Sequence, residues 1–292
     1  MFKRIIVATD LSDASYAVVN CLGGLKAYGA EECLLLQCLS MQESVSLALS
    51  YTTDALEKNL EDQKQLLEKQ GFKVETRIVT GPAKREINRI ASDEEYSVIV
   101  VGAQEQTMVS EAFSSEIAYD VIHYALKPVL LIRLKDIPEN GVSCIRVTGC
   151  NISNHILFPT DFSDNADLAF SYVQNMVSDG VNKVTLLHVQ DQVRISPHLM
   201  DKLEEFNRID TARLEEMKKV LQSKGNVEVD IVLRFGSPTA EIIKLVEELN
   251  VQLVVMGSQG RGYIKEIFLG SVSHNIARHS TASVLLIPAK RD

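Results

Sequence analysis

The sequence predicts an α/β fold of two tandem domains, each a doubly wound (Rossmann-like), five-stranded, mostly parallel sheet with helices on both faces. The first observation behind this prediction is a repeat. Lys3–Ser15 (KRIIVATDLSDAS) resembles Asn154–Ala166 (NHILFPTDFSDNA), and VLLI occurs at both Val129–Ile132 and Val284–Ile287. The second is that each copy alternates short apolar runs with segments of helical periodicity. The third is that these runs are continuous, which is typical of parallel strands covered on both faces.

The elements follow the same order in both copies and are clearest in the second. Its strands are expected at Ile156–Pro159, Lys183–Val189, Val227–Arg234, Gln252–Met256 and Val284–Ile287. Its helices are expected at Ala166–Ser178, from about Pro197 to Lys224, at Pro238–Asn250 and at Ser271–His279. Ser237 before Pro238 is typical of a helix start, because serine caps free amides and proline fits the first helical position. Right-handed connections between the strands then give one parallel sheet in each copy.

The repeat divides the chain into a first domain at residues 1–134, a linker at 135–153 and a second domain at 154–292. The linker holds residues that interrupt regular structure, among them Pro138, Gly141 and Gly149, and Cys144–Val147 could add a short extra strand within it. The second copy gains four residues between its second and third strands, because the offset between matching residues rises from 151 to 155.

Composition and charge exclude several classes of protein. The chain has 292 residues, of which 46% are hydrophobic and 24% charged, as in ordinary globular proteins. Its net charge of −9 argues against unspecific binding to nucleic acid or to an anionic membrane. No apolar run approaches the roughly 18 residues of a membrane span. The five cysteines form no CxxC pair and no signal-peptide pattern precedes the first strand, so we expect reduced thiols and a cytoplasmic location.

The most informative stretch runs from Gly257 to Ser273 (GSQGRGYIKEIFLGSVS) and follows the apolar run Leu253–Met256. Glycines stand at its first, fourth and fourteenth positions, and a serine follows the last of them. Glycines after a strand let backbone amides approach a ligand, and amides at a helix start bind anions without a basic side chain. The stretch therefore predicts a phosphate cradle at the carboxyl ends of the strands. The pattern GxxxxGK[ST] is absent, which excludes a P-loop NTPase.

These residues resemble a known family. Each half is similar to a universal stress protein domain, and the chain resembles a tandem member of that family. The family motif of Gly, two residues, Gly, nine residues, Gly and then Ser or Thr is complete in the second half, which resembles the ATP-binding branch. Pro159–Asp161 (PTD) and Leu187–Val189 (LHV) also match. The resemblance implies ATP or another adenine nucleotide (AMP or ADP) as the ligand and leaves open whether Mg²⁺ accompanies it.

The resemblance also implies a set of nucleotide-binding residues in the second half. Those after the first strand would face the sugar or adenine, Val189 would contact adenine through its main chain, and the motif would hold the ribose and phosphates. The set is Pro159, Thr160, Asp161, Val189, Met256, Gly257, Gly260, Arg261, Gly270, Ser271, Val272 and Ser273. Simpler interpretations exist: Asp161 would cap a helix, Met256 would be a core residue and Arg261 an exposed loop residue. Gly260 and Gly262 would then be ordinary turn glycines.

The first copy lacks the complete motif. Glu105 and Glu116 stand where the second copy has its second glycine and its serine, and Ser115 replaces its third glycine. Two carboxylates in a phosphate cradle repel a triphosphate, so we expect no ATP binding of the family type in the first half. Asp10 matches Asp161, although a helix cap explains it equally well.

Three functions remain as hypotheses. The first is a regulatory or sensing module that binds an adenine nucleotide in its second domain without efficient catalysis. The second is an enzyme, a slow ATPase or autokinase, because phosphoryl transfer needs mainly positioning and charge stabilisation. The third is a purely structural interaction protein. We assign no catalytic residue, because Ser271 has no evident partner base, and no metal ligand, because no two histidines have helical metal-binding spacing.

Partners are predicted only in outline. Family members commonly pair through their last strands, so the two VLLI segments could pair within the chain as a pseudo-dimer. A homodimer of two chains is left open, and a protein partner cannot be named from the sequence. We expect neither nucleic acid nor a membrane as a partner.

Overall fold

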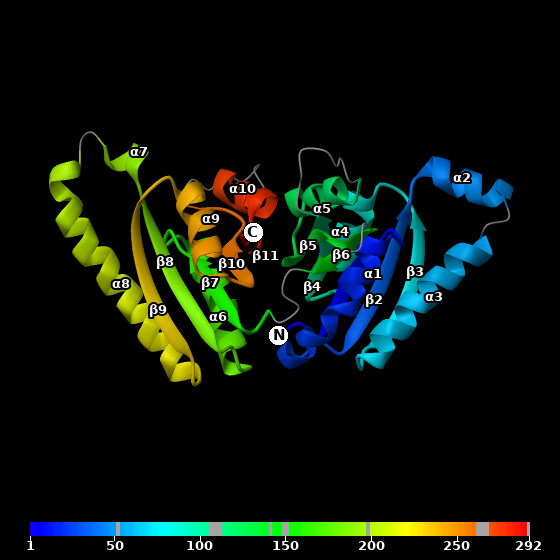
Figure 1. The fold of residues 1–292 in the computed structure, drawn as a ribbon, viewed down its shortest axis with the longest axis horizontal. Coiled ribbons are helices and arrows are strands. Elements are labelled where there is room, and N and C mark those ends of the chain that lie inside the picture. The colour runs from blue at the N-terminus through cyan, green and yellow to red at the C-terminus, as the bar shows by residue number, and fades with distance from the viewer. Residues whose placement is uncertain are drawn as a thin grey trace. The chain divides into compact units, whose positions relative to one another are not determined.

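The computed structural model describes residues 1–50, 53–104, 113–139, 142–147, 152–196, 199–260 and 269–290. The chain divides into two compact units, Met1–Cys150 and Asn151–Asp292. The domain bounds expected from the repeat stay a prediction, whereas the fold class is confirmed: each unit is a mostly parallel sheet with helices on both faces (Figure 1).

The second unit has five parallel strands in the order β9-β8-β7-β10-β11. The strands are β7 (His155–Pro159), β8 (Lys183–Asp191), β9 (Glu228–Gly236), β10 (Leu253–Gly257) and β11 (Ser283–Ile287). Every residue of β7, β10 and β11 is buried, whereas the edge strand β9 has only two buried residues. The continuous apolar runs of the sequence therefore mark strands covered on both faces.

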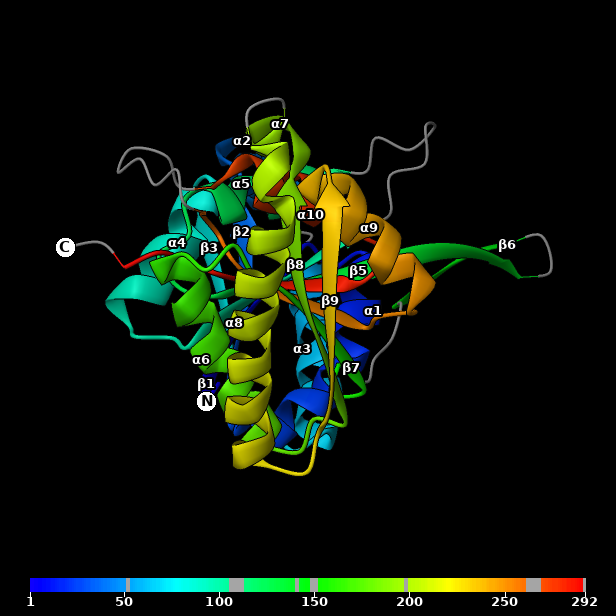
Figure 2. The same cartoon turned by 90° about the vertical axis from the view of Figure 1, so that its left-hand side faces the viewer.

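Helices cover both faces of this sheet. They are α6 (Asp164–Ser178), the single-turn α7 (Gln192–Ile195), α8 (Leu203–Lys224), α9 (Pro238–Glu248) and α10 (Ser271–His279). Helix α8 lies along β9 and β8 (Figure 2) and contacts α6, while α9 contacts α10. The helix expected from about Pro197 begins only at Leu203, because Asp191 caps the separate turn of α7 and a 3-10 turn, Met200–Lys202, precedes α8.

The first unit repeats the strand order as β3-β2-β1-β4-β5. Its strands are β1 (Arg4–Thr9), β2 (Glu32–Leu39), β3 (Lys73–Thr80), β4 (Val98–Gln104), β5 (Val129–Glu139) and β6 (Val142–Val147). Its helices are α1 (Asp13–Asn20), α2 (Met41–Ser50), α3 (Thr53–Lys69), α4 (Ala83–Asp93) and α5 (Phe113–His123), with a 3-10 segment at Leu22–Tyr28. Strand β6 is antiparallel to β5, so much of the expected linker forms a hairpin, and the suspected extra strand is confirmed.

The cysteines depart from the expectation of reduced thiols at one position. Cys33 and Cys38 are free, but Cys21 is disulfide-bonded. Burial, with a smaller contribution from Glu86, raises the pKa of Cys38 to about 12, so this thiol stays protonated at neutral pH. Cys33 is more deeply buried, and burial raises the pKa of its thiol as well.

None of the helices in the described part of the chain is long and apolar enough to cross a membrane.

Candidate functional site

A pocket of about 660 Å³ opens at the carboxyl ends of β7, β8 and β10 in the second unit. Its size falls within the range of roughly 300–1,000 Å³ that is usual for small-molecule sites. The pocket is lined by all the residues that the sequence singles out except Arg261, which lies outside the described residues. These lining residues are Pro159, Thr160, Asp161, Val189, Met256, Gly257, Gly260, Gly270, Ser271, Val272 and Ser273.

The turn between β7 and α6 places Asp161 at this pocket. Phe162 adopts a left-handed backbone conformation (φ 56°), which lets the chain turn sharply after the strand. Asp161 Oδ1 accepts hydrogen bonds from the amide and hydroxyl of Ser163, at 3.1 and 2.6 Å. Ser163, and not Asp161, is the N-cap of α6, because its hydroxyl accepts from the amide of Ala166. The helix-cap interpretation of Asp161 is therefore wrong, because Asp161 is bonded to the N-cap residue and is not itself that residue.

The other carboxylate oxygen of Asp161 points across the pocket towards Gly260. A Cβ atom on Gly260 would lie 2.5 Å from Asp161 Oδ2, so the absence of a side chain there leaves room for the carboxylate. A side chain at position 260 would therefore displace the Asp161 carboxylate from this position. The close approach of Gly260 and Asp161 brings the loop after β10 against the turn that follows β7.

Asn165, which sequence reasoning missed, holds the base of the pocket together. Its side-chain oxygen accepts from the amide of Gln259 at 2.9 Å, and its side-chain amide donates to the carbonyl of Ile287 at 3.2 Å. A Cβ atom on Gly257 would meet Asn165 Oδ1 at 2.7 Å. Gly257 is therefore needed for packing against α6, whatever it contributes to a ligand.

The N-terminus of α10 faces the pocket without a side-chain cap. Gly270 is the N-cap residue, and the first-turn amides of Ser271, Val272 and Ser273 have no intrahelical acceptor. These amides and the helix dipole favour an anion at this end. The hydroxyl of Ser273 donates to the carbonyl of Ser258 at 2.5 Å, so this hydroxyl ties the loop to the helix. The Ser273 hydroxyl, which the family resemblance assigns to the phosphates, is thus already used in this hydrogen bond, whereas Ser271 is exposed.

The opposite wall comes from β8 and α8, and its polar residues were also missed. His188 Nδ1 lies 2.7 Å from the carbonyl oxygen of Thr160, and a carbonyl only accepts, so Nδ1 carries a hydrogen. His188 Nε2 faces Asp210 Oδ2 at 3.6 Å, and Gln190 Nε2 donates to the same oxygen at 2.9 Å. The centroid of the Phe162 ring lies 4.6 Å from that of the His188 ring and 4.4 Å from the Arg213 guanidinium. The sequence contained one signal, the LHV tripeptide that includes His188.

Comparison with known proteins places this site in a family. The family model described as "Universal stress protein family" matches residues 1–133 and 153–288. The chain belongs to the universal stress protein family. It is a tandem member, because the model matches twice.

Relatives and solved structures agree with this assignment. The chain is 34% identical over 154 residues to universal stress protein MJ0577 of Methanocaldococcus jannaschii, covering 46% of this chain and 94% of the relative. It is 26% identical over 145 residues to universal stress protein YxiE of Bacillus subtilis, covering 46% of this chain and 98% of the relative. A universal stress protein structure from Archaeoglobus fulgidus matches with a TM-score of 0.71 and 23% identity, covering 97% of this chain and 95% of that one. The last likeness extends the fold over the full tandem.

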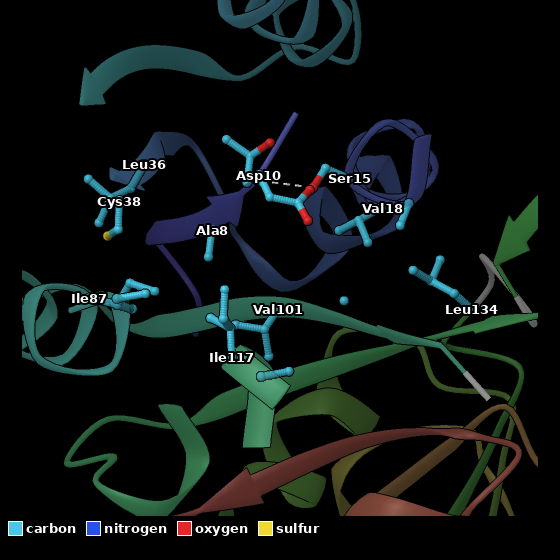
Figure 3. A pocket seen from close by; sticks show the side chains of 15 residues that line it. Ala8, Asp10, Ser15, Val18, Leu36, Cys38, Ile87, Val101, Ile117 and Leu134 are labelled. Carbon is cyan, nitrogen blue, oxygen red and sulfur yellow. Dashed lines mark hydrogen bonds between the residues drawn. The ribbon is translucent and has the colours of Figure 1, made fainter. Parts of the chain in front are cut away.

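The first universal stress protein domain has a much smaller cavity at the corresponding place, about 70 Å³ (Figure 3). Asp10 is turned to the start of α1, where its Oδ1 accepts from the hydroxyls of Ser12 and Ser15 at 2.5 Å each. Val18 fills the space beside Gly102, where a Cβ atom would lie 2.7 Å from its methyl group. A cavity of this size holds water molecules, far below the volume of a nucleotide site.

The residues that replace the motif in the first domain are only partly described. Glu105 lies outside the described residues. Ser115 and Glu116 belong to α5, where the structure describes the backbone at these positions. The expected repulsion between their carboxylates and a phosphate stays a prediction.

Proposed function

We propose that the second domain binds an adenine nucleotide (ATP, ADP or AMP) as a regulatory or sensing module, as in the ATP-binding branch of the family. One observation carries the proposal. An uncapped helix N-terminus and a carboxylate face a single pocket of about 660 Å³, on loops held close by Gly257 and Gly260. The amides of α10 suit phosphates, and Asp161 suits the hydroxyls of a ribose.

The apolar part of the pocket suits a flat base. Ile195, Leu199, Phe206 and Ile209 line it beside Val189, whose main chain is the expected base contact. Aromatic and aliphatic side chains with a few polar groups are the usual lining of nucleotide pockets. Base and phosphates would thus occupy opposite ends of the same cavity.

We further propose that this domain binds without efficient catalysis. His188, the histidine in the pocket lining, has Nδ1 bonded to Thr160 and Nε2 directed at Asp210, so it is not placed to take a proton from water. The alternative is slow hydrolysis or self-phosphorylation, in which Asp161 would position Mg²⁺ or water. Turnover with Mg²⁺ above that of a heat-inactivated control would support the alternative.

The first test is mass spectrometry of the small molecule released when the freshly purified protein is denatured, with its stoichiometry per chain. We expect about one adenine nucleotide per chain. Two per chain would show that the first domain also binds. None, with no uptake after addition of ATP and Mg²⁺, would overturn the proposal and favour a structural role.

Three further assignments stand as proposals of the same kind. They are a cytoplasmic location, pairing of the two domains through their VLLI strands, and a homodimer of two chains. Separating the protein by size-exclusion chromatography with light scattering would distinguish a monomer from a homodimer.

A further inference from the structure

One face of α8 is turned to the pocket of the second domain. Phe206, Ile209, Asp210 and Arg213 all line the cavity, and their spacing of three, four and seven residues from Phe206 places them on one side of the helix. The repeat has gained four residues between β8 and β9, the segment that contains α8. This wall therefore belongs to the part of the second domain that departs most in length from the first.

Asp210 is the charged member of this face with a free acceptor. Its side chain is 13% exposed, and its Oδ2 is used by Gln190 Nε2 and faces His188 Nε2. Its Oδ1 accepts no hydrogen bond from any residue that the structure describes. A carboxylate that lines a pocket with one oxygen unused can accept a hydrogen bond from a ligand.

The hydrogen bond from Gln190 places this carboxylate next to the proposed base contact. Gln190 follows Val189 directly in β8, so Asp210 lies beside the strand segment whose main chain would touch the base. The apolar side chains of Phe206 and Ile209 flank Asp210 in the helix and would cover the ring. A polar group on the edge of that ring would thus face Asp210.

We propose that Asp210 selects nucleotides of 6-aminopurines over those of 6-oxopurines. This inference rests on the proposed function. An ionised carboxylate only accepts, so it binds the amino group at position 6 of adenine. The oxygen at position 6 of hypoxanthine or guanine is an acceptor, and two facing acceptors repel each other. Gln190 acts as a positioning residue, because its side-chain amide donates to Asp210 Oδ2 and holds the carboxylate at the strand.

The other charged groups that line the pocket are Asp161, Asp191, Arg194 and Arg213. Arg213 lies on the same helix face, one turn from Asp210.

The test is the affinity for ATP and for ITP, measured by isothermal titration calorimetry on the full chain. These nucleotides differ at position 6 of the base and at the neighbouring ring nitrogen. For the wild type we expect ATP to bind at least about tenfold more tightly, the range of a hydrogen bond to a charged group. Asp210→Asn should narrow the ratio to about threefold or less, because an amide can donate to the oxygen of ITP.

Asp191→Asn is the matched control. It removes one negative charge from the same pocket lining and retains an oxygen to accept from the amide of Val193, the present cap of α7. It should move both affinities equally and leave their ratio unchanged. A further test on the wild type uses purine riboside triphosphate, which lacks the substituent at position 6. Affinity should decrease from ATP to purine riboside triphosphate to ITP.

The outcomes separate this inference from the proposed function. Wild-type protein that binds ATP and ITP equally overturns the inference and leaves the function intact. A full ATP preference retained in Asp210→Asn also overturns it, since the main chain of β8 would then read the base. Failure of the wild type to bind either nucleotide overturns the proposed function and the inference with it.

Discussion

Replacement of Asn165 by alanine tests whether one buried side chain holds the base of the pocket. Asn165 is buried and joins two backbone groups that are far apart in the chain, the amide of Gln259 and the carbonyl of Ile287. The alanine variant would leave both groups without this partner. The carbonyl of Ile287 would still accept from the amide of Ser258 at 2.8 Å, so the cost is that of two lost hydrogen bonds. Each contributes about 0.5–1.5 kcal/mol, so the free energy of unfolding should fall by about 1–3 kcal/mol.

The assay is urea unfolding followed by circular dichroism, because the chain contains no tryptophan. Asn275→Ala is the matched control. Asn275 donates one exposed hydrogen bond to Ser271 within its own helix, so its loss should cost less than about 0.5 kcal/mol. Nucleotide affinity should also fall in Asn165→Ala, since the loop after β10 loses its anchor. A loss below about 1 kcal/mol, or equal to that of the control, would refute the reasoning.

Three further predictions concern other parts of the chain. Gly270→Asp should reduce ATP affinity at least about tenfold, because it places a negative charge beside the proposed phosphate site. The fold should stay intact, because the backbone at Gly270 (φ −73°) suits any residue and a Cβ atom would have ordinary contacts at 3.4 Å. Calorimetry would measure the affinities, with Gly270→Ala as the control, and an aspartate variant that binds ATP as tightly as the wild type would contradict the site. Cys38 should resist iodoacetamide at pH 7 in the folded protein and react after denaturation, because burial raises the pKa of its thiol to about 12; peptide mass spectrometry would reveal early labelling if this is wrong. Burial lowers the pKa of His155 in the folded protein. The unfolded chain therefore binds a proton at this residue more readily than the folded protein does. The stability that His155 contributes is thus present above about pH 6.5 and is lost as the pH falls. Urea unfolding at pH 7.5 and 5.5 should therefore show a smaller pH effect in His155→Gln than in the wild type, and an equal effect would count against it.

Much of the fold was predictable from local pattern. The continuous apolar runs located the strands of the second unit within two residues at either end, because burial on both faces leaves a signal in consecutive residues. The start of α9 at Pro238, with Ser237 as its N-cap residue, was also predictable. The start of α8 was less predictable, because the segment before it has no regular apolar period and forms the separate turn of α7, capped by Asp191, and a 3-10 turn.

The candidate site divides in the same way. The glycine spacing of the second half predicted which loops meet at the carboxyl ends of the strands, since parallel strands bring their ends to one edge. It could not predict why Gly257 must be a glycine, because its steric partner is Asn165 in another helix. Nor could it show that the hydroxyl of Ser273 is bonded to the loop rather than open to a ligand.

By itself the sequence determined the repeat, the family resemblance, the order of elements and the motif that only the second half retains. These follow from periodicity and spacing, which are properties of neighbouring residues. Only the tertiary structure decided that Asn165 bonds Ile287, 122 positions away, and that Asp210 of α8 meets His188 and Gln190 of β8. Such contacts depend on how helices pack onto a sheet, and a linear pattern carries little information about which side chains face each other across that packing.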